Sequence, residues 1–149
     1  MSSHSERGFS IVELVVVMTI ISLLVAIAIP TVIGFRRAAQ DRAAQTDLRN
    51  ALLAEKTYFL ENDEVYTDVG ADLTGYQTGA PYAADPADGV YLDLHDADVT
   101  IVCLVRDSAG GSTFSIWEHP MSGTFYGDTD LSGADCPAVP PVGYRSDGF

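Results

Sequence analysis

Basic residues are scarce in this chain of 149 residues. Only 8 lysines and arginines accompany 21 aspartates and glutamates, and the net charge is −13. From Thr57 onward there are 16 acidic residues but only Arg106 and Arg145 as bases, a net charge of −14. Because phosphate recognition needs clustered lysine and arginine, this distribution argues against nucleic-acid binding through the C-terminal part. An acidic surface of this kind favours solvation and mutual repulsion.

The groups that enzymes use are also few. The three histidines, His4, His95 and His119, are scattered and lack metal-ligand spacing, and there are only two cysteines. The sequence contains no arrangement typical of a Ser-His-Asp or Cys-His site or of paired catalytic carboxylates, and no glycine-rich phosphate loop follows a predicted strand. No set of residues in the sequence therefore supports an enzyme, and no cofactor is expected.

Long apolar runs, by contrast, are present. Residues 14–29 form sixteen consecutive positions with only two polar side chains, Thr19 and Ser22. With its flanks, the stretch 9–35 is long enough to cross a bilayer as a helix, which takes roughly 20 residues. One carboxylate, Glu13, lies near the start of the run. An acid inside an apolar span is costly, and it usually marks a partner or a function.

The start of this run carries a specific pattern. A short polar segment, MSSHSERG, ends at Gly8 and is followed by Phe9, Glu13 and, within the apolar run, Pro30. A cleaved secretory signal would have a shorter apolar core and a small-residue cleavage site after it. The pattern resembles the type IV pilin (prepilin) family instead. In that family a polar leader ends in glycine, phenylalanine usually follows, the fifth residue after the cut is glutamate, and a proline interrupts the span. The resemblance covers about the first 55 residues.

The resemblance implies how these residues are used. Residues 1–8 would be a leader that a membrane prepilin peptidase removes after Gly8, and the new amino group of Phe9 would be methylated. Glu13 would neutralise the N-terminal ammonium group of a neighbouring subunit, and Pro30 would supply a flexible joint. The implied fold is α+β and pilin-like. The apolar half of a long N-terminal helix (9–34) protrudes, and its amphipathic half packs on a small antiparallel sheet.

The function implied by the resemblance is that of a structural subunit of a type IV pilus, a surface filament for adhesion or motility. Its partners would be copies of itself and related pilins, the prepilin peptidase and an inner-membrane assembly platform. The precursor would lie in the cytoplasmic membrane and the product in the extracellular pilus. Two alternatives stay open. One is a pseudopilin of a type II secretion system. The other is a singly membrane-anchored envelope domain that binds a ligand, with an uncut leader and a monomeric state.

The soluble head is expected to comprise residues 35–149. Its helix, 35–61, shows apolar residues at helical spacing: Ala44, Leu48, Ala51, Leu52, Tyr58 and Phe59. A connection, 62–89, follows and includes a short strand at 65–67. Alternating and β-branched segments then predict an antiparallel sheet over 90–126, with strands at 90–94, 99–105, 113–117 and 124–126. One apolar face of this sheet is expected to be covered by the helix. The remainder, 127–149, is expected to be an irregular loop region.

Cys103 and Cys136 follow the apolar span, and a pair of cysteines in a small exported domain predicts a disulfide. The alternative is two unrelated free thiols. One rule points the other way, because the positive-inside bias would place the basic flank at Arg36, Arg37 and Arg42 in the cytoplasm. The cysteine pair and the leader pattern outweigh that bias, so we expect the head to be exported.

The segment 127–135 contains oxygen-bearing residues at alternate positions, followed by a glycine. It resembles the first half of a calcium loop of the D-x-D-x-[ST]-G kind, and some pseudopilins bind calcium in a comparable C-terminal loop. The candidate ligands are Asp128, Asp130, Ser132 and Asp135. Val139 stands where an EF-hand loop has its bidentate glutamate. An acidic turn before Cys136, without a metal, is therefore the favoured interpretation.

Overall fold

The computed structural model describes residues 9–76, 79–133 and 135–149. It contains two helices, α1 (Ile11–Glu61) and α2 (Gly70–Leu73), and four strands. The strands are β1 (Tyr91–His95), β2 (Asp98–Asp107), β3 (Thr113–His119) and β4 (Gly123–Gly127). The chain divides into two compact units, with the boundary after Arg36. The predicted α+β class is confirmed.

Helix α1 is continuous over 51 residues and includes Pro30. Its second half has one packed face, and the buried residues are Ala44, Leu48, Ala51, Leu52, Ala54 and Glu55. The spacing of three or four residues is that of one side of an α-helix. Four of these six were predicted, and Tyr58 and Phe59 pack against the same cluster. The amphipathic interpretation of this segment is therefore correct.

The sheet is antiparallel throughout, in the order β1-β2-β3-β4. Every neighbouring pair is also consecutive in the sequence, so short turns fix the register. Opposite Leu104 in β2 lies Ile116 in β3, and opposite Cys103 lies Trp117. Side chains alternate between faces along a strand. Leu104 and Ile116 therefore belong to one face of the sheet, and Cys103 and Trp117 belong to the other.

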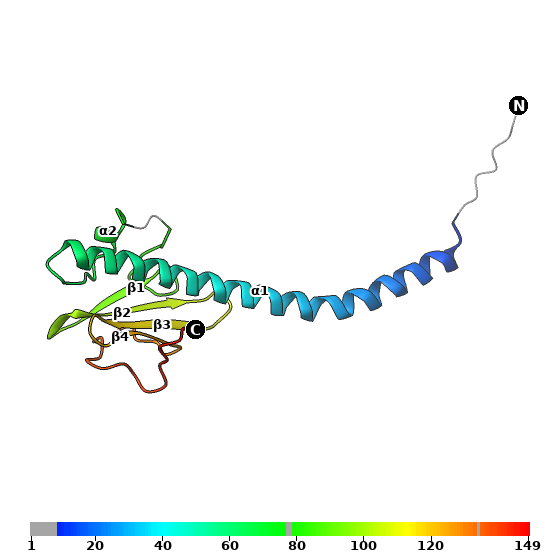
Figure 1. The fold of residues 1–149 in the computed structure, drawn as a ribbon. Coiled ribbons are helices and arrows are strands. Elements are labelled where there is room, and N and C mark those ends of the chain that lie inside the picture. Colours follow the sequence, from blue (N-terminus) through cyan, green and yellow to red (C-terminus); the bar gives the residue numbers. More distant parts are fainter. Residues whose placement is uncertain (1–8, 77–78, 134) are drawn as a thin grey trace, which may run out of the picture. The chain divides into compact units, whose positions relative to one another are not determined.

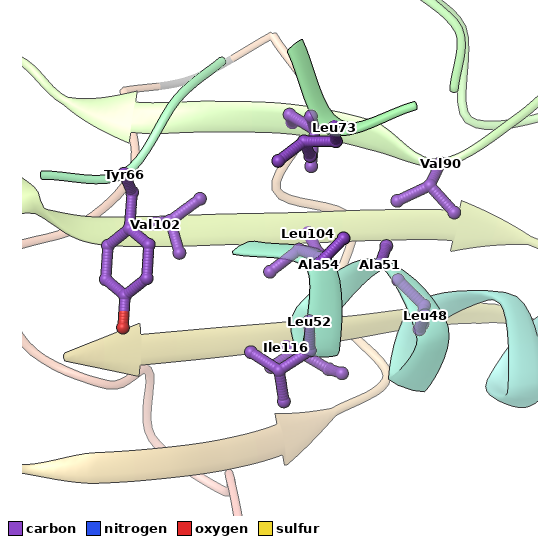
Figure 2. Packing of buried hydrophobic residues seen from close by; sticks show 11 residues of the cluster. Leu48, Ala51, Leu52, Ala54, Tyr66, Leu73, Val90, Val102, Leu104 and Ile116 are labelled. Carbon is purple, nitrogen blue, oxygen red and sulfur yellow. The ribbon is translucent and has the colours of Figure 1, made fainter. Parts of the chain in front are cut away.

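One face of the sheet packs against the second half of α1 (Figure 1). Figure 2 shows Leu48, Ala51 and Leu52 of the helix among Val102, Leu104 and Ile116 of the sheet. These side chains are at most 7% exposed. Truncating such a fully buried leucine typically costs about 2–5 kcal/mol. The helix and the sheet therefore stabilise each other through this layer.

The opposite face of the sheet is covered as well, which corrects the prediction of a single apolar face. Ile101, Cys103, Val105 and Trp117 form a second cluster there, packed against Leu131, Cys136 and Tyr144 of the C-terminal region. The reason is visible in β2, where every residue from Ile101 to Val105 is apolar. Strands buried on both faces have continuous rather than alternating apolar sequences. The C-terminal region is thus part of the core.

The connection between α1 and β1 also differs from the prediction. No strand forms at 65–67; these residues make one backbone bond to the sheet, from Tyr66 N–H to the Val99 carbonyl at 3.0 Å. The next N–H, that of Thr67, is donated to the carboxylate of Glu55 at 3.3 Å instead. Successive N–H groups of an extended segment point to opposite sides, so that of Tyr66 faces the sheet and that of Thr67 faces α1. The unpredicted helix α2 follows and places Leu73 in the core.

Candidate assembly site

The surface of α1 before Arg36 is apolar all round. From Phe9 to Phe35 every residue is exposed, and the large apolar side chains are 46–81% exposed. This part of α1 is long and apolar enough to cross a membrane, and none of the window that meets this criterion is buried. A helix that is apolar on every face needs an apolar environment, either lipid or other helices. This surface is the candidate site.

The few polar groups of the span are satisfied inside the helix. The hydroxyls of Thr19 and Ser22 donate to the carbonyls of Val15 and Met18, each at 2.8 Å. Thr31 donates to the Ile27 carbonyl at 3.4 Å. A hydroxyl bonded to the carbonyl four residues earlier needs no external partner. These residues are therefore compatible with an apolar environment, as segments inside a bilayer must be.

Glu13 is different, because none of the hydrogen bonds among the described residues engages its carboxylate. It lies in the first turn of α1 and is exposed. None of the ion pairs found among the described residues involves it. The N-terminal end of a helix favours a negative charge, but only by about 0.3–1 kcal/mol. That is far less than the cost of moving a lone carboxylate out of water. A carboxylate moved into an apolar environment is tolerated best when a cation pairs with it.

The other predicted residues of this region lie close to Glu13 or within the same helix. Phe9 is the first described residue and is 80% exposed, while Gly8 lies outside the described residues. Ser10 directly precedes the helix, and its Oγ accepts the N–H of Val12 at 3.3 Å. Pro30 lies inside α1 and has no N–H to donate, which removes one hydrogen bond of the helix.

The predicted disulfide is confirmed. Cys103 of β2 and Cys136 of the C-terminal region are bonded, with their Cα atoms 5.6 Å apart. Both side chains are fully buried in the second cluster. Next to the bridge, the indole N–H of Trp117 donates to the Pro137 carbonyl at 2.7 Å. The bridge and this hydrogen bond hold the C-terminal region against the sheet.

The four candidate calcium ligands are not gathered into one site. Asp130 accepts hydrogen bonds from the backbone N–H and the hydroxyl of Ser132, at 2.8 and 2.6 Å. Asp135 accepts the N–H of Asp96 at 3.0 Å and lies 3.3 Å from the ring of His95. Asp128 is exposed. In the described part of the chain no three acidic, histidine or cysteine side chains are placed to hold a metal.

Comparison with known proteins identifies the family to which this chain belongs. A model of the prokaryotic N-terminal methylation motif matches residues 3–29. The type IV major pilin protein PilA of Myxococcus xanthus is 39% identical over 68 residues, and the match covers 46% of this chain and 30% of that protein. The competence protein ComGC of Bacillus subtilis is 36% identical over 69 residues, which cover 69% of that protein. The chain belongs to the type IV pilin family.

Two further relatives extend the comparison to the head of this pilin. The type IV wide pilus major component PilA4 of Thermus thermophilus is 25% identical over 139 residues, 92% of this chain and 99% of that protein. The type II secretion system core protein G of Aeromonas hydrophila is 29% identical over 94 residues, 62% of this chain and 66% of that protein. The matches thus cover between 30% and 99% of the relatives' own lengths. The two matches with the highest identity each cover less than half of this chain.

A buried polar cluster in the pilin head was not predicted. Glu55 is fully buried on the packed face of α1; one carboxylate oxygen accepts the Thr67 N–H, and the other has no partner among the described residues. Burial raises the pKa of Glu55 to about 8; the bond from Thr67 lowers it in part, and Asp68 adds to the rise. The signal was present in the sequence, because Glu55 follows Ala51 by four residues and Leu48 by seven.

The head contains a second buried carboxylate. Glu118 of β3 is 3% exposed and pairs with Lys56 of α1 at 3.2 Å. The hydroxyls of Thr124 and Tyr66 also donate to it. Burial first, and then the nearby carboxylate of Glu118, raise the pKa of Tyr66. These contacts join the helix, the connection and two strands, so the cluster is a structural element of the head.

Proposed function

We propose that this chain is a structural subunit of a type IV pilus and polymerises through its N-terminal helix into a surface filament. The observation that carries the proposal is the surface of α1 from Phe9 to Phe35, apolar and exposed on every face, with Glu13 as its only carboxylate. Such a surface is stable in a bilayer before assembly and against other apolar helices afterwards. The pilin relatives support the same role.

Glu13 gives this packing its register. Cleavage after Gly8 would create an ammonium group at Phe9, one turn away from Glu13 along the helix. In an apolar filament core a lone charge is very costly, whereas an opposite pair is tolerated. A subunit whose Phe9 amine meets the Glu13 of a neighbour neutralises both charges. A subunit in another register leaves both charges buried without partners, so that register is disfavoured.

Processing of the precursor and its assembly into a filament require further partners. A prepilin peptidase would remove residues 1–8 and methylate Phe9 in the cytoplasmic membrane. An assembly platform in the inner membrane would then transfer the subunit into the filament. The acidic head would face solvent, with the disulfide between Cys103 and Cys136 formed after export. The secretion-system relative favours a second candidate function, that of a pseudopilin in a short periplasmic filament.

The intact mass of the protein in filaments sheared from its host tests the proposal. We expect a chain that begins at Phe9, one methyl group heavier than the cleaved chain and two hydrogens lighter because of the disulfide. Recovery of this cleaved chain only from the membrane fraction would favour the pseudopilin. A full-length chain beginning at Met1 or Ser2 would overturn the proposal in favour of an anchored monomeric domain.

Replacing Glu13 with alanine tests the register argument directly. We expect Glu13→Ala to abolish efficient assembly, because the neighbouring Phe9 amine then remains buried without a partner. Export and the fold of the head should be unchanged. The matched control is Asp88→Ala, which removes an exposed acid of the head. Normal filament yield from the Glu13 variant, measured by shearing and electron microscopy, would contradict the argument.

A further inference from the structure

The outer face of α1 in the head is basic, whereas the rest of the head is acidic. Opposite the buried face, the helix exposes a stripe whose members recur at intervals of three, four or seven residues. We call it the basic stripe: Arg42, Thr46, Arg49, Leu53 and Leu60. Leu53 and Leu60 are 58% and 80% exposed. Exposed leucines that follow arginines on one helix face are typical of a contact surface rather than of a solvated face.

No acidic side chain of α1 is exposed between Arg42 and Leu60. Asp47 lies 3.5 Å from Arg106, and Glu55 is buried. The arginines of the stripe form no ion pair with any residue that the structure describes. Arg49 is held with its guanidinium 5.8 Å from the ring centre of Phe149, and Arg42 is exposed. The stripe thus presents positive charge that the head itself leaves unneutralised.

The complementary charge lies just beyond the end of α1. Residues 61–72, here called the acidic segment, contain five carboxylates and no lysine or arginine. All five are exposed: Glu61, Asp63, Glu64, Asp68 and Asp72. The four ion pairs of the described residues include none of them. Each chain therefore carries two exposed surfaces of opposite charge, and the acidic segment follows the basic stripe along the chain.

We propose that the basic stripe of one subunit docks on the acidic segment of a second copy of the same chain. The inference rests on the proposed function, because it assigns a contact within the filament. Arg42 and Arg49 lie about 12–30 residues before the carboxylates of the acidic segment. Each helical residue of that separation adds about 1.5 Å along the helix axis. A parallel copy displaced by roughly 20–30 Å along the helix axis brings the two surfaces together. A contact between two different surfaces does not close on itself, so it propagates a filament.

A polyanion such as DNA is the other conceivable occupant, and the charges disfavour it. The head as a whole is strongly acidic and would repel a phosphate backbone at the distances over which charge acts in solution. Two arginines followed by two exposed leucines on the same helix face offer a protein surface both charge complementarity and apolar area. The chain itself supplies such a surface at high local concentration in the membrane.

The test is charge reversal in the full-length chain expressed in its host. We expect Arg42→Glu to reduce sheared filaments about tenfold, which corresponds to about 1.4 kcal/mol per contact. Arg42→Lys keeps the charge and should assemble normally. Combining Arg42→Glu with Glu61→Lys and Asp68→Lys should restore assembly. The melting temperature and Trp117 fluorescence of each purified variant show whether the head is folded.

Normal filament yield from Arg42→Glu would overturn the docking proposal, and so would a loss that the acidic-segment changes do not restore. If filaments are normal but retain less DNA, the stripe binds a nucleic acid and the proposal is wrong. Failure of the wild-type chain to form filaments at all is a different result, since it refutes the proposed function itself.

Discussion

Glu55→Gln is expected to remove a pH dependence from the stability of the head. Glu55 is fully buried, one of its oxygens has no partner, and burial raises its pKa from an ordinary 4.5 to about 8. Between these values the folded head keeps a proton that the unfolded chain releases. The contribution of Glu55 to the stability of the head is therefore fully present below about pH 4.5. It decreases as the pH rises and is lost once the pH has passed about 8.

The size of the effect follows from this window. Each pH unit inside it changes the free energy of unfolding by about 1.4 kcal/mol. From pH 5 to pH 8 the contribution of Glu55 should thus fall by roughly 4 kcal/mol. Glutamine keeps an oxygen to accept the Thr67 N–H and carries no charge. The variant should be only slightly different from wild type at pH 5 and several kcal/mol more stable at pH 8.

Urea unfolding of the full chain in detergent micelles, at pH 5, 6, 7 and 8, measures this effect. Trp117 is the single tryptophan and is 1% exposed, so its fluorescence reports the head. The quantity of interest is the difference between variant and wild type, because other groups also titrate in this range. Asp88→Asn, an exposed acid, is the control and should give a constant difference. Parallel stability curves for Glu55→Gln and wild type would refute the argument that Glu55 is neutral when folded.

Two further predictions concern the C-terminal region. Replacing Cys103 and Cys136 with serine should lower the free energy of unfolding by about 3–4 kcal/mol, the loop entropy expected for a separation of 33 residues. An unchanged urea midpoint for that double variant would show that the second cluster alone holds the region. Calcium should leave the thermal midpoint of the wild-type chain unchanged relative to a chelator, because Asp135 is engaged with Asp96 and His95. A midpoint that rises and saturates with calcium would show instead that residues 128–135 rearrange into a site.

The N-terminal half of the chain was predictable because its signals are local. The apolar run of residues 14–29 and the position of Glu13 can be identified without knowing what any residue contacts. The helix was expected over 9–61 and extends over Ile11–Glu61. The four strands were placed within two residues of their observed ends, because turns separate alternating or β-branched segments.

The errors arose where a residue's role depends on a distant segment. The strand expected at 65–67 does not form: the N–H of Tyr66 bonds to the sheet, but that of Thr67 faces the other way and donates to Glu55 of α1. The spacing of oxygens over residues 128–135 likewise does not reveal that Asp135 contacts residues 39 and 40 positions earlier in the chain. Neither interaction can be inferred from local spacing, because each partner is brought close only by the fold.

The sequence by itself thus determined the assembly surface of this pilin. The apolar character of the helix and its single carboxylate do not depend on contacts with other segments. The tertiary structure decided the interior of the head. It buried Glu55 and paired Glu118 with Lys56, and it placed the C-terminal region over the second face of the sheet. The physical reason is that burial and electrostatic environment arise from packing between segments, which a linear pattern does not contain.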